Sequence, residues 1–107
     1  MSFKIEASEQ FIKELKRLAK KYPSLKADIG ELVGSLSVDP RQGTSLGQNC
    51  FKVRLAIKSK GKGKSGGARV ITLVVMLAER VVLLSVYDKS EKESISDDEL
   101  TALIKEI

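Results

Sequence analysis

The chain has 107 residues with 19 Lys plus Arg, 14 Asp plus Glu and no His, which gives a formal net charge of +5. A chain of this length buries enough surface for one hydrophobic core, so we expect a single domain over residues 1–107. With one Cys and no His, the composition excludes an intramolecular disulfide, His-based acid–base catalysis and nearly every zinc or other transition-metal site.

The first 40 residues predict one strand and two helices. Alternation of apolar and polar residues over 3–7 is typical of a short strand. Ser8 is a predicted N-cap, and the helix after it carries the apolar stripe Phe11, Leu15, Leu18 and Tyr22. Pro23 ends that helix, and Ser24 is expected to cap a second one, which ends before residue 39 and carries the stripe Leu25, Ile29, Leu32 and Leu36. We therefore expect a helical hairpin that covers one face of a sheet.

The second half predicts three strands and a last helix. Over residues 51–58 the hydrophobic period is two, with core residues on one face and Lys52, Arg54, Ala56 and Lys58 on the other. Apolar runs at 68–77 and 81–87, joined by a turn at 78–80, favour a hairpin of central strands. Ser96 and Glu99 form a capping box that opens a short final helix. The predicted fold is an α+β domain with a mainly antiparallel four-stranded sheet, the helical hairpin on one face and the short C-terminal helix.

No membrane or export signal accompanies these elements. The N-terminus lacks the basic start and apolar stretch of a signal peptide, and no apolar run reaches the roughly 18 residues of a membrane span. We therefore expect a cytoplasmic protein without a membrane partner, a bound metal or a cofactor.

Positive charge is concentrated in the middle of the chain. Residues 41–69 contain eight basic side chains and no Asp or Glu, whereas the remaining residues sum to −3. Such segregation is typical of a surface that binds a polyanion. The eight are Arg41, Lys52, Arg54, Lys58, Lys60, Lys62, Lys64 and Arg69.

The Lys/Gly-rich segment 58–67 is the first candidate for RNA binding. It contains the pattern GxGxxG, but it joins two predicted strands, so no helix N-terminus follows to hold a phosphate. A flexible loop remains, with Lys58, Lys60, Lys62 and Lys64 suited to contact a nucleic-acid backbone, together with Arg41 upstream. A solvated loop without function is the alternative interpretation.

The cationic face of the strand predicted over 51–58 is a stronger indication of nucleic-acid binding than the Lys/Gly-rich segment. Lys52 and Arg54 are one pleat apart, and Arg69 begins the next strand, so the three could bracket a phosphate. Surface strands often carry two or three basic residues without a function, which is the competing interpretation. Further candidates lie where the last strand runs out into a loop, a common location for catalytic side chains: Tyr87, Lys89 and Lys92. The alternative interpretation is that this segment is a solvated connection without a function.

Three segments, 51–54, 66–69 and 87–91, resemble the RelE/ParE superfamily of bacterial toxins, in particular its HigB-like and RelE-like branch. The resemblance implies a type II toxin that is neutralised by a cognate antitoxin, enters the ribosome and cleaves mRNA there without a metal. It also implies catalytic roles for Lys52, Arg54 and Arg69. After the last strand the match loosens, since the family's basic position falls on Ser90 and its Tyr position near Ser96. Lys89, Lys92 and Tyr87 are the candidates for these two roles.

The implied chemistry suits a chain without His, because RNA carries its own nucleophile in the 2′-hydroxyl. Arg54 and Arg69 are suited to offset charge on the phosphoryl oxygens. Lys52 acts either as the general base or as a fixed cation, and the sequence leaves both open. Two other functions remain open as well: a ParE-like inhibitor of DNA gyrase, and an RNA-binding module without catalysis. Surplus apolar and basic surface predicts an acidic antitoxin segment with an apolar stripe as partner.

Overall fold

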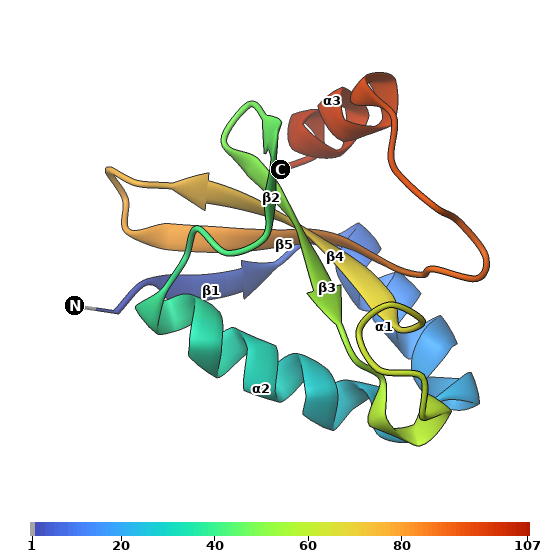
Figure 1. Ribbon diagram of the computed structural model, residues 1–107. Helices are drawn as coiled ribbons and strands as arrows, with labels where there is room; N and C mark the ends of the chain where they lie inside the picture. The colour runs from blue at the N-terminus through green and yellow to red at the C-terminus, as the bar shows by residue number, and fades with distance from the viewer. Residues whose placement is uncertain (1) are drawn as a thin grey trace.

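The computed structural model describes residues 2–107, which form one sheet flanked by helices on both faces (Figure 1). The elements in chain order are β1 (Lys4–Ala7), α1 (Glu9–Lys21), α2 (Leu25–Val38), β2 (Thr44–Gly47), β3 (Cys50–Leu55), the 3₁₀ turn η1 (Lys58–Lys60), β4 (Ala68–Val75), β5 (Arg80–Asp88) and α3 (Asp97–Lys105).

The sheet has five strands in the order β1-β5-β4-β3-β2, and it is mixed. β1 pairs with β5 in parallel, whereas the other neighbours are antiparallel. The sheet is mainly antiparallel, as predicted, but it has five strands where four were predicted, and one of its four pairings is parallel. β2 escaped prediction because its four residues, TSLG, carry no apolar alternation; a tight turn at Gln48 and Asn49, both at positive φ, folds it back on β3.

The two predicted N-terminal helices are present, although only one is capped as expected. Ser8 accepts a hydrogen bond from the backbone N–H of Phe11 at 3.1 Å, which confirms it as the cap of α1. Ser24 occupies the cap position of α2 without capping it. Its hydroxyl instead donates to the buried carboxylate of Asp28 at 2.7 Å, so the predicted role of Ser24 is wrong.

Each face of the sheet is buried under different helices. α1 packs on β5, and α2 packs on β1 and β3, so both helices rest on the sheet more than on each other. Their apolar stripes form one core with Val53, Val70 and Val86. α3 covers the opposite face through Leu100 and Leu103, and its predicted capping box is confirmed. Within residues 2–107, no helix has the length and apolar character needed to cross a membrane.

Two strand ends differ from prediction. β3 stops at Leu55, so Lys58 does not continue the cationic strand face but begins η1. β4 stops at Val75, since the next two residues turn into solvent, with Leu77 fully exposed and Glu79 at φ 50°. Both strands were predicted too long because the hydrophobic pattern of each continues into the turn that follows it.

Candidate active site

A row of side chains crosses three strands on the face covered by α3. Arg54 on β3 pairs with Arg69 on β4, which pairs with Tyr87 on β5. Directly opposed residues project to the same face of a sheet, with Cβ atoms about 5 Å apart. Lys52 precedes Arg54 by two residues and shares this face. The structure thus brings four of the predicted site residues to one face.

A β-bulge in β5 places Tyr87 in this row. The pairing of β4 with β5 leaves Leu84 as an extra residue between Leu83 and Ser85. Strict alternation would put Leu84 and Tyr87 on opposite faces, yet both lie in the buried cluster under α3. The apolar run 81–87 does not show the bulge, because it is apolar on both faces.

A pocket of about 450 Å³ adjoins this row, and we call it the cationic pocket. All four residues predicted to be catalytic line it, although they come from β3, β4 and the segment after β5. Its lining residues are Thr44, Lys52, Arg54, Arg69, Lys89, Glu93 and Ser94. Four cations around one hollow form a site for an anion such as a phosphodiester.

Arg69 is the most rigidly held of these cations. Its side chain is buried, and its guanidinium donates to the backbone carbonyls of Lys64 at 2.9 Å, Ala68 at 3.1 Å and Ser65 at 3.4 Å. It forms no salt bridge within residues 2–107, so its charge is not neutralised by a neighbouring carboxylate. Arg54, which pairs with Arg69 across the two strands, is exposed. The pocket is therefore faced by the fixed guanidinium of Arg69 and by the guanidinium of Arg54, which is free to adjust.

Tyr87 and Lys92 do not line the cationic pocket. The Lys92 ammonium lies 5.4 Å from the centre of the Tyr87 ring and pairs with Glu99 of α3. The Tyr87 hydroxyl is buried and has no hydrogen-bond partner among the described residues. Burial raises the pKa of this hydroxyl, although the charge of Arg69 acts in the opposite direction. Tyr87 therefore stays protonated at neutral pH, beneath Lys92.

Glu93 is the residue of the cationic pocket that the sequence reasoning missed. It is the acidic side chain among four cations there, on the exposed segment between β5 and α3. A carboxylate in this place can accept a proton. Its only signal in the sequence is its nearness to the candidates Lys89 and Lys92, because which side chains of an irregular segment turn inward depends on tertiary structure.

The lysines of the Lys/Gly segment have different environments. Lys58 pairs with Glu31 of α2 at 2.8 Å on the surface, which raises the pKa of its ammonium. Lys60 pairs with the fully buried carboxylate of Asp88 at 2.7 Å. Lys62 and Lys64 are exposed. Ion pairs therefore engage two of the four lysines predicted to bind RNA.

Asp88 joins three elements at this point. Its carboxylate accepts hydrogen bonds from Lys60, from the hydroxyl of Tyr22 and from the backbone N–H of Ser90. Burial by itself would raise the pKa of Asp88, but these hydrogen bonds outweigh it and hold the pKa far below its usual range. The end of β5 is thereby fastened to α1 and to η1.

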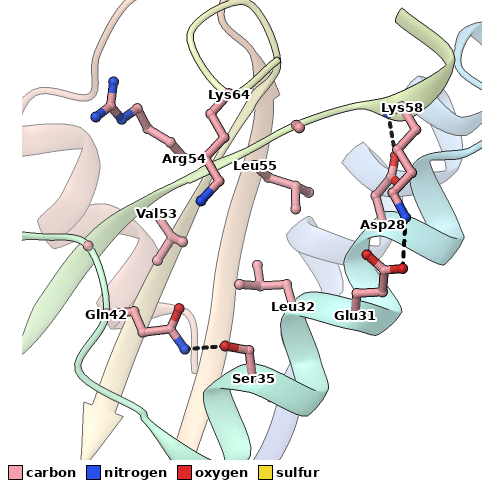
Figure 2. A pocket seen from close by; sticks show the side chains of 12 residues that line it. Asp28, Glu31, Leu32, Ser35, Gln42, Val53, Arg54, Leu55, Lys58 and Lys64 are labelled. Atoms are coloured by element: carbon pink, nitrogen blue, oxygen red, sulfur yellow. Dashed lines mark hydrogen bonds and ion pairs between the residues drawn. The ribbon is translucent and has the colours of Figure 1, made fainter. Parts of the chain in front are cut away.

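A second hollow, of about 420 Å³, separates α2 from β3 (Figure 2). Its apolar floor is formed by Leu32, Val53 and Leu55. Lys64 reaches into it from the loop, whereas the side chain of Arg54 points to the other side of β3. This groove therefore lies on the opposite side of β3 from the cationic pocket.

Two further expectations concern Arg41 and metal ions. The guanidinium of Arg41 lies 5.9 Å from the centre of the Phe51 ring, and Arg41 lines neither hollow. Residues 2–107 contain no group of three or more Cys, Asp or Glu side chains arranged to hold a metal ion.

A family model described as RelE toxin of the RelE / RelB toxin-antitoxin system matches residues 11–107 of the chain. No curated protein is significantly similar to it in sequence.

Several solved structures share the fold. A double mutant of the E. coli toxin RelE in the free state has a TM-score of 0.67 and 18% identity, covering 100% of this chain and 99% of that one. The isolated E. coli RelE toxin has a TM-score of 0.63 and 16% identity, covering 99% and 100%. The RelBE2 toxin-antitoxin complex from Mycobacterium tuberculosis has a TM-score of 0.58 and 16% identity, covering 82% and 99%. At these identities the likeness establishes the fold.

Proposed function

This chain belongs to the RelE toxin family, and on that premise we propose that it is a ribosome-dependent mRNA endonuclease. The observation that carries the proposal is the cationic pocket, where Lys52, Arg54, Arg69 and Lys89 gather from three separate segments. Cations around a hollow bind the phosphodiester and oppose the charge that builds up on it during cleavage. The proposal implies action in the cytoplasm, where ribosomes and mRNA are found.

The reaction we propose uses the RNA's own nucleophile. The 2′-oxygen attacks the adjacent phosphorus, so that the O2′–P bond forms as the P–O5′ bond breaks. The products are a 2′,3′-cyclic phosphate and a free 5′-hydroxyl. One proton leaves the 2′-hydroxyl for a base, and one is delivered to the departing 5′-oxygen.

The pocket offers groups for each of these tasks. Arg69, fixed by the loop carbonyls, is preorganised to hold a phosphoryl oxygen, and Arg54 completes the clamp from the neighbouring strand. Lys52 and Glu93 are the candidates for the base, and Lys89 for the proton donor. Tyr87 and Lys92 support the site from below without lining it.

We further propose that a cognate antitoxin neutralises the protein. Among the structures with this fold, one from M. tuberculosis and one from E. coli are toxin-antitoxin complexes. The basic pocket and the surrounding surface suit an acidic partner segment.

The test compares Arg54→Ala with the control Lys105→Ala, which removes one exposed positive charge from the end of α3. Arg54 is the better target, because it is exposed, whereas Arg69 also holds the loop. Loss of one such donor should slow cleavage of ribosome-bound mRNA by about a hundred- to a thousandfold. The control should cleave as the wild type does.

The readout in cells is translation arrest together with mapping of new mRNA 5′ ends after induction. Full activity of Arg54→Ala would contradict the proposal. DNA damage without mRNA cleavage would favour a gyrase inhibitor. RNA binding without cleavage by the wild type would indicate a binding module.

A further inference from the structure

The second half of β5 is open along the edge that faces β1. β1 is the neighbour of β5 on that side, and it ends at Ala7 opposite Leu83, so within residues 2–107 no strand continues the pairing there as far as Asp88. The exposed backbone groups of such an edge need other partners. Ser8, the cap of α1, supplies the first ones. Its N–H donates to the carbonyl of Leu83 at 3.0 Å, and its hydroxyl donates to the carbonyl of Leu84 at 3.2 Å.

Glu14 of α1 bonds the next part of this edge with one carboxylate oxygen. That oxygen accepts hydrogen bonds from the hydroxyl of Ser85 at 2.7 Å and from the backbone N–H of Val86 at 3.2 Å. Because the side chain of Ser85 is buried, its hydroxyl depends on this carboxylate for a partner. Glu14 therefore holds the strand directly after Leu84, the extra residue of the β-bulge.

The hydrophobic pattern of β5 does not fix the register of this segment. Residues 81–84 and 86 are all apolar and buried, so a slip by one residue would exchange one set of apolar side chains for another. The bonds to Glu14 do distinguish the two registers. Without the bulge, the Val86 N–H would turn toward β4 and the Ser85 hydroxyl would turn to the other face, since both alternate along a strand. Glu14 would then lose both hydrogen bonds as they now stand.

The residues after the bulge belong to the candidate site. In the bulged register Tyr87 opposes Arg69 on β4, and Lys89 lines the cationic pocket. A slip by one residue would turn Tyr87 to the face covered by α1 and α2, and it would shift Lys89 by about 3.3 Å along the strand direction. The cations of β3 and β4 would stay in place, because their own pairing does not involve β5.

We infer that Glu14 is a positioning residue, whose carboxylate holds the bulge of β5 in the register that puts Lys89 in the cationic pocket. Glu14 does not line that pocket; it lines a separate hollow of about 190 Å³ between α1 and α3. For its effect on cleavage the inference rests on the proposed function, in which Lys89 is the proton donor. Its effect on the register of β5 is independent of that function.

The experiment compares Glu14→Met and Glu14→Gln with the control Glu9→Met, at an exposed carboxylate of the same helix. Met has a similar size but only a weak acceptor, whereas Gln keeps an amide oxygen that can accept both hydrogen bonds. Single-turnover cleavage of ribosome-bound mRNA separates the rate at saturation from the affinity. Nuclear magnetic resonance reports the register without any cleavage, through hydrogen exchange of the Val86 amide and through contacts between β4 and β5.

Glu14→Met should lower the saturating rate by about a hundredfold, as misplacement of a reacting group by about 1 Å can do. Affinity should change little, because the two guanidinium groups that face the pocket stay in place. The Val86 amide should exchange at least about tenfold faster, and the contact between Tyr87 and Arg69 should weaken. Glu14→Gln should cleave nearly as fast as the wild type, and so should the Glu9→Met control.

A Glu14→Met protein that cleaves at the wild-type rate would overturn the inference. A slower rate with unchanged register signals would also overturn it, as would a Glu14→Gln protein no more active than Glu14→Met. If Glu14→Met does not fold, Ser85→Ala takes its place and should show smaller losses of the same kind, since it keeps the bond to Val86. If the wild type cleaves no mRNA, the proposed function fails, and the register signals alone decide whether Glu14 holds the bulge.

Discussion

Arg54 and Arg69 face the same pocket from neighbouring strands, but the protein holds them differently. Arg69 is buried and donates to three backbone carbonyls, so its orientation is set before any ligand arrives. Arg54 is exposed and can follow the substrate. A preorganised donor contributes most to transition-state stabilisation, because it needs no reorientation during the reaction. Substitution of Arg69 would also release the loop, which is why function is better tested at Arg54.

Glu93 carries the first prediction at the scale of the residue. Glu93→Gln keeps the size of the side chain and removes its ability to accept a proton. If Glu93 is the base, cleavage of ribosome-bound mRNA should fall by about a hundred- to ten-thousandfold, as is typical when a general base is removed. RNA affinity should stay the same or increase, since a negative charge leaves the cationic pocket.

Glu91→Gln is the matched control, because Glu91 lies on the same segment but pairs with Arg17 outside the pocket. Single-turnover cleavage separates the chemical step from binding. An unchanged rate for Glu93→Gln would exclude Glu93 as the base and leave Lys52 as the candidate.

Among the elements, the Lys/Gly loop departs most from what its composition suggests. Gly and Lys residues predict a flexible, solvated loop, yet contacts hold it at both ends. Ser59 donates its backbone N–H to Ser24, Lys60 pairs with Asp88, and Arg69 binds the carbonyls of Lys64 and Ser65. Gly67 is required where the loop meets β3, because a Cβ there would lie 2.1 Å from the carbonyl oxygen of Leu55.

The buried pair of Lys60 and Asp88 gives a prediction about this element. Asp88→Asn leaves the Lys60 ammonium without its carboxylate, so the free energy of unfolding at pH 7 should fall by about 3 kcal/mol. Lys89 follows Asp88 directly, and its N–H donates to the carbonyl of Gly67 at the end of the loop at 3.1 Å, so loss of the pair should also disturb the position of Lys89. Cleavage should therefore fall as well.

The pH dependence of this effect has a definite sign. Because the folded state lowers the pKa of Asp88, the pair contributes its full stability above the unfolded value of about 3.9 and loses it progressively below. The gap between wild type and Asp88→Asn in urea unfolding should be widest near neutral pH and narrow below about pH 4. Asp39→Asn, at an exposed carboxylate, serves as control. A gap that is constant with pH would contradict this account of Asp88.

The molecule as a whole is organised around a sheet that is buried on both faces. One cluster lies under α1 and α2, a second under α3, and a third closes the end of the sheet with Phe51, Val74 and Val81. The central strands β4 and β5 contribute side chains to all three. Because β4 and β5 are shared, loss of packing in one cluster would expose strands that also contribute side chains to the other two clusters.

This organisation predicts that residues 1–107 unfold as one cooperative unit. The chain has no Trp, and its two Tyr residues lie in different clusters, Tyr22 under the N-terminal helices and Tyr87 under α3. Tyr87→Phe removes only an unpaired hydroxyl and leaves Tyr22 as the single fluorescent reporter. Thermal transitions followed by Tyr fluorescence and by far-UV circular dichroism should coincide in this variant and in the wild type. Separate midpoints would show that the two faces unfold independently.

Local patterns in the sequence were enough to predict the helices, the three main strands and the family. The stripe from Phe11 to Tyr22, the alternation from Phe51 to Leu55 and the capping box at Ser96 each express a rule that acts within a few residues. The same locality explains why the strand pair Lys52 and Arg54 could be identified as a cationic face. The family model over residues 11–107 confirms the resemblance that these segments carried.

Other features depend on pairing between distant residues, and the sequence alone could not show them. The parallel placement of β1 beside β5, the short β2 and the bulge at Leu84 are decided by the register between strands. Register depends on how well whole faces pack, and no window of a few residues contains that information.

The distribution of positive charge also depends partly on the sequence and partly on the tertiary structure. The sequence by itself determined that eight cations fall in residues 41–69, with no acid among them, and that the chemistry must work without His. Only the tertiary structure decided that Asp88 and Glu31 engage Lys60 and Lys58, and that Glu93 joins the cationic pocket. The physical reason is that charge interactions depend on distance in space, and folding brings together charges that lie far apart along the chain.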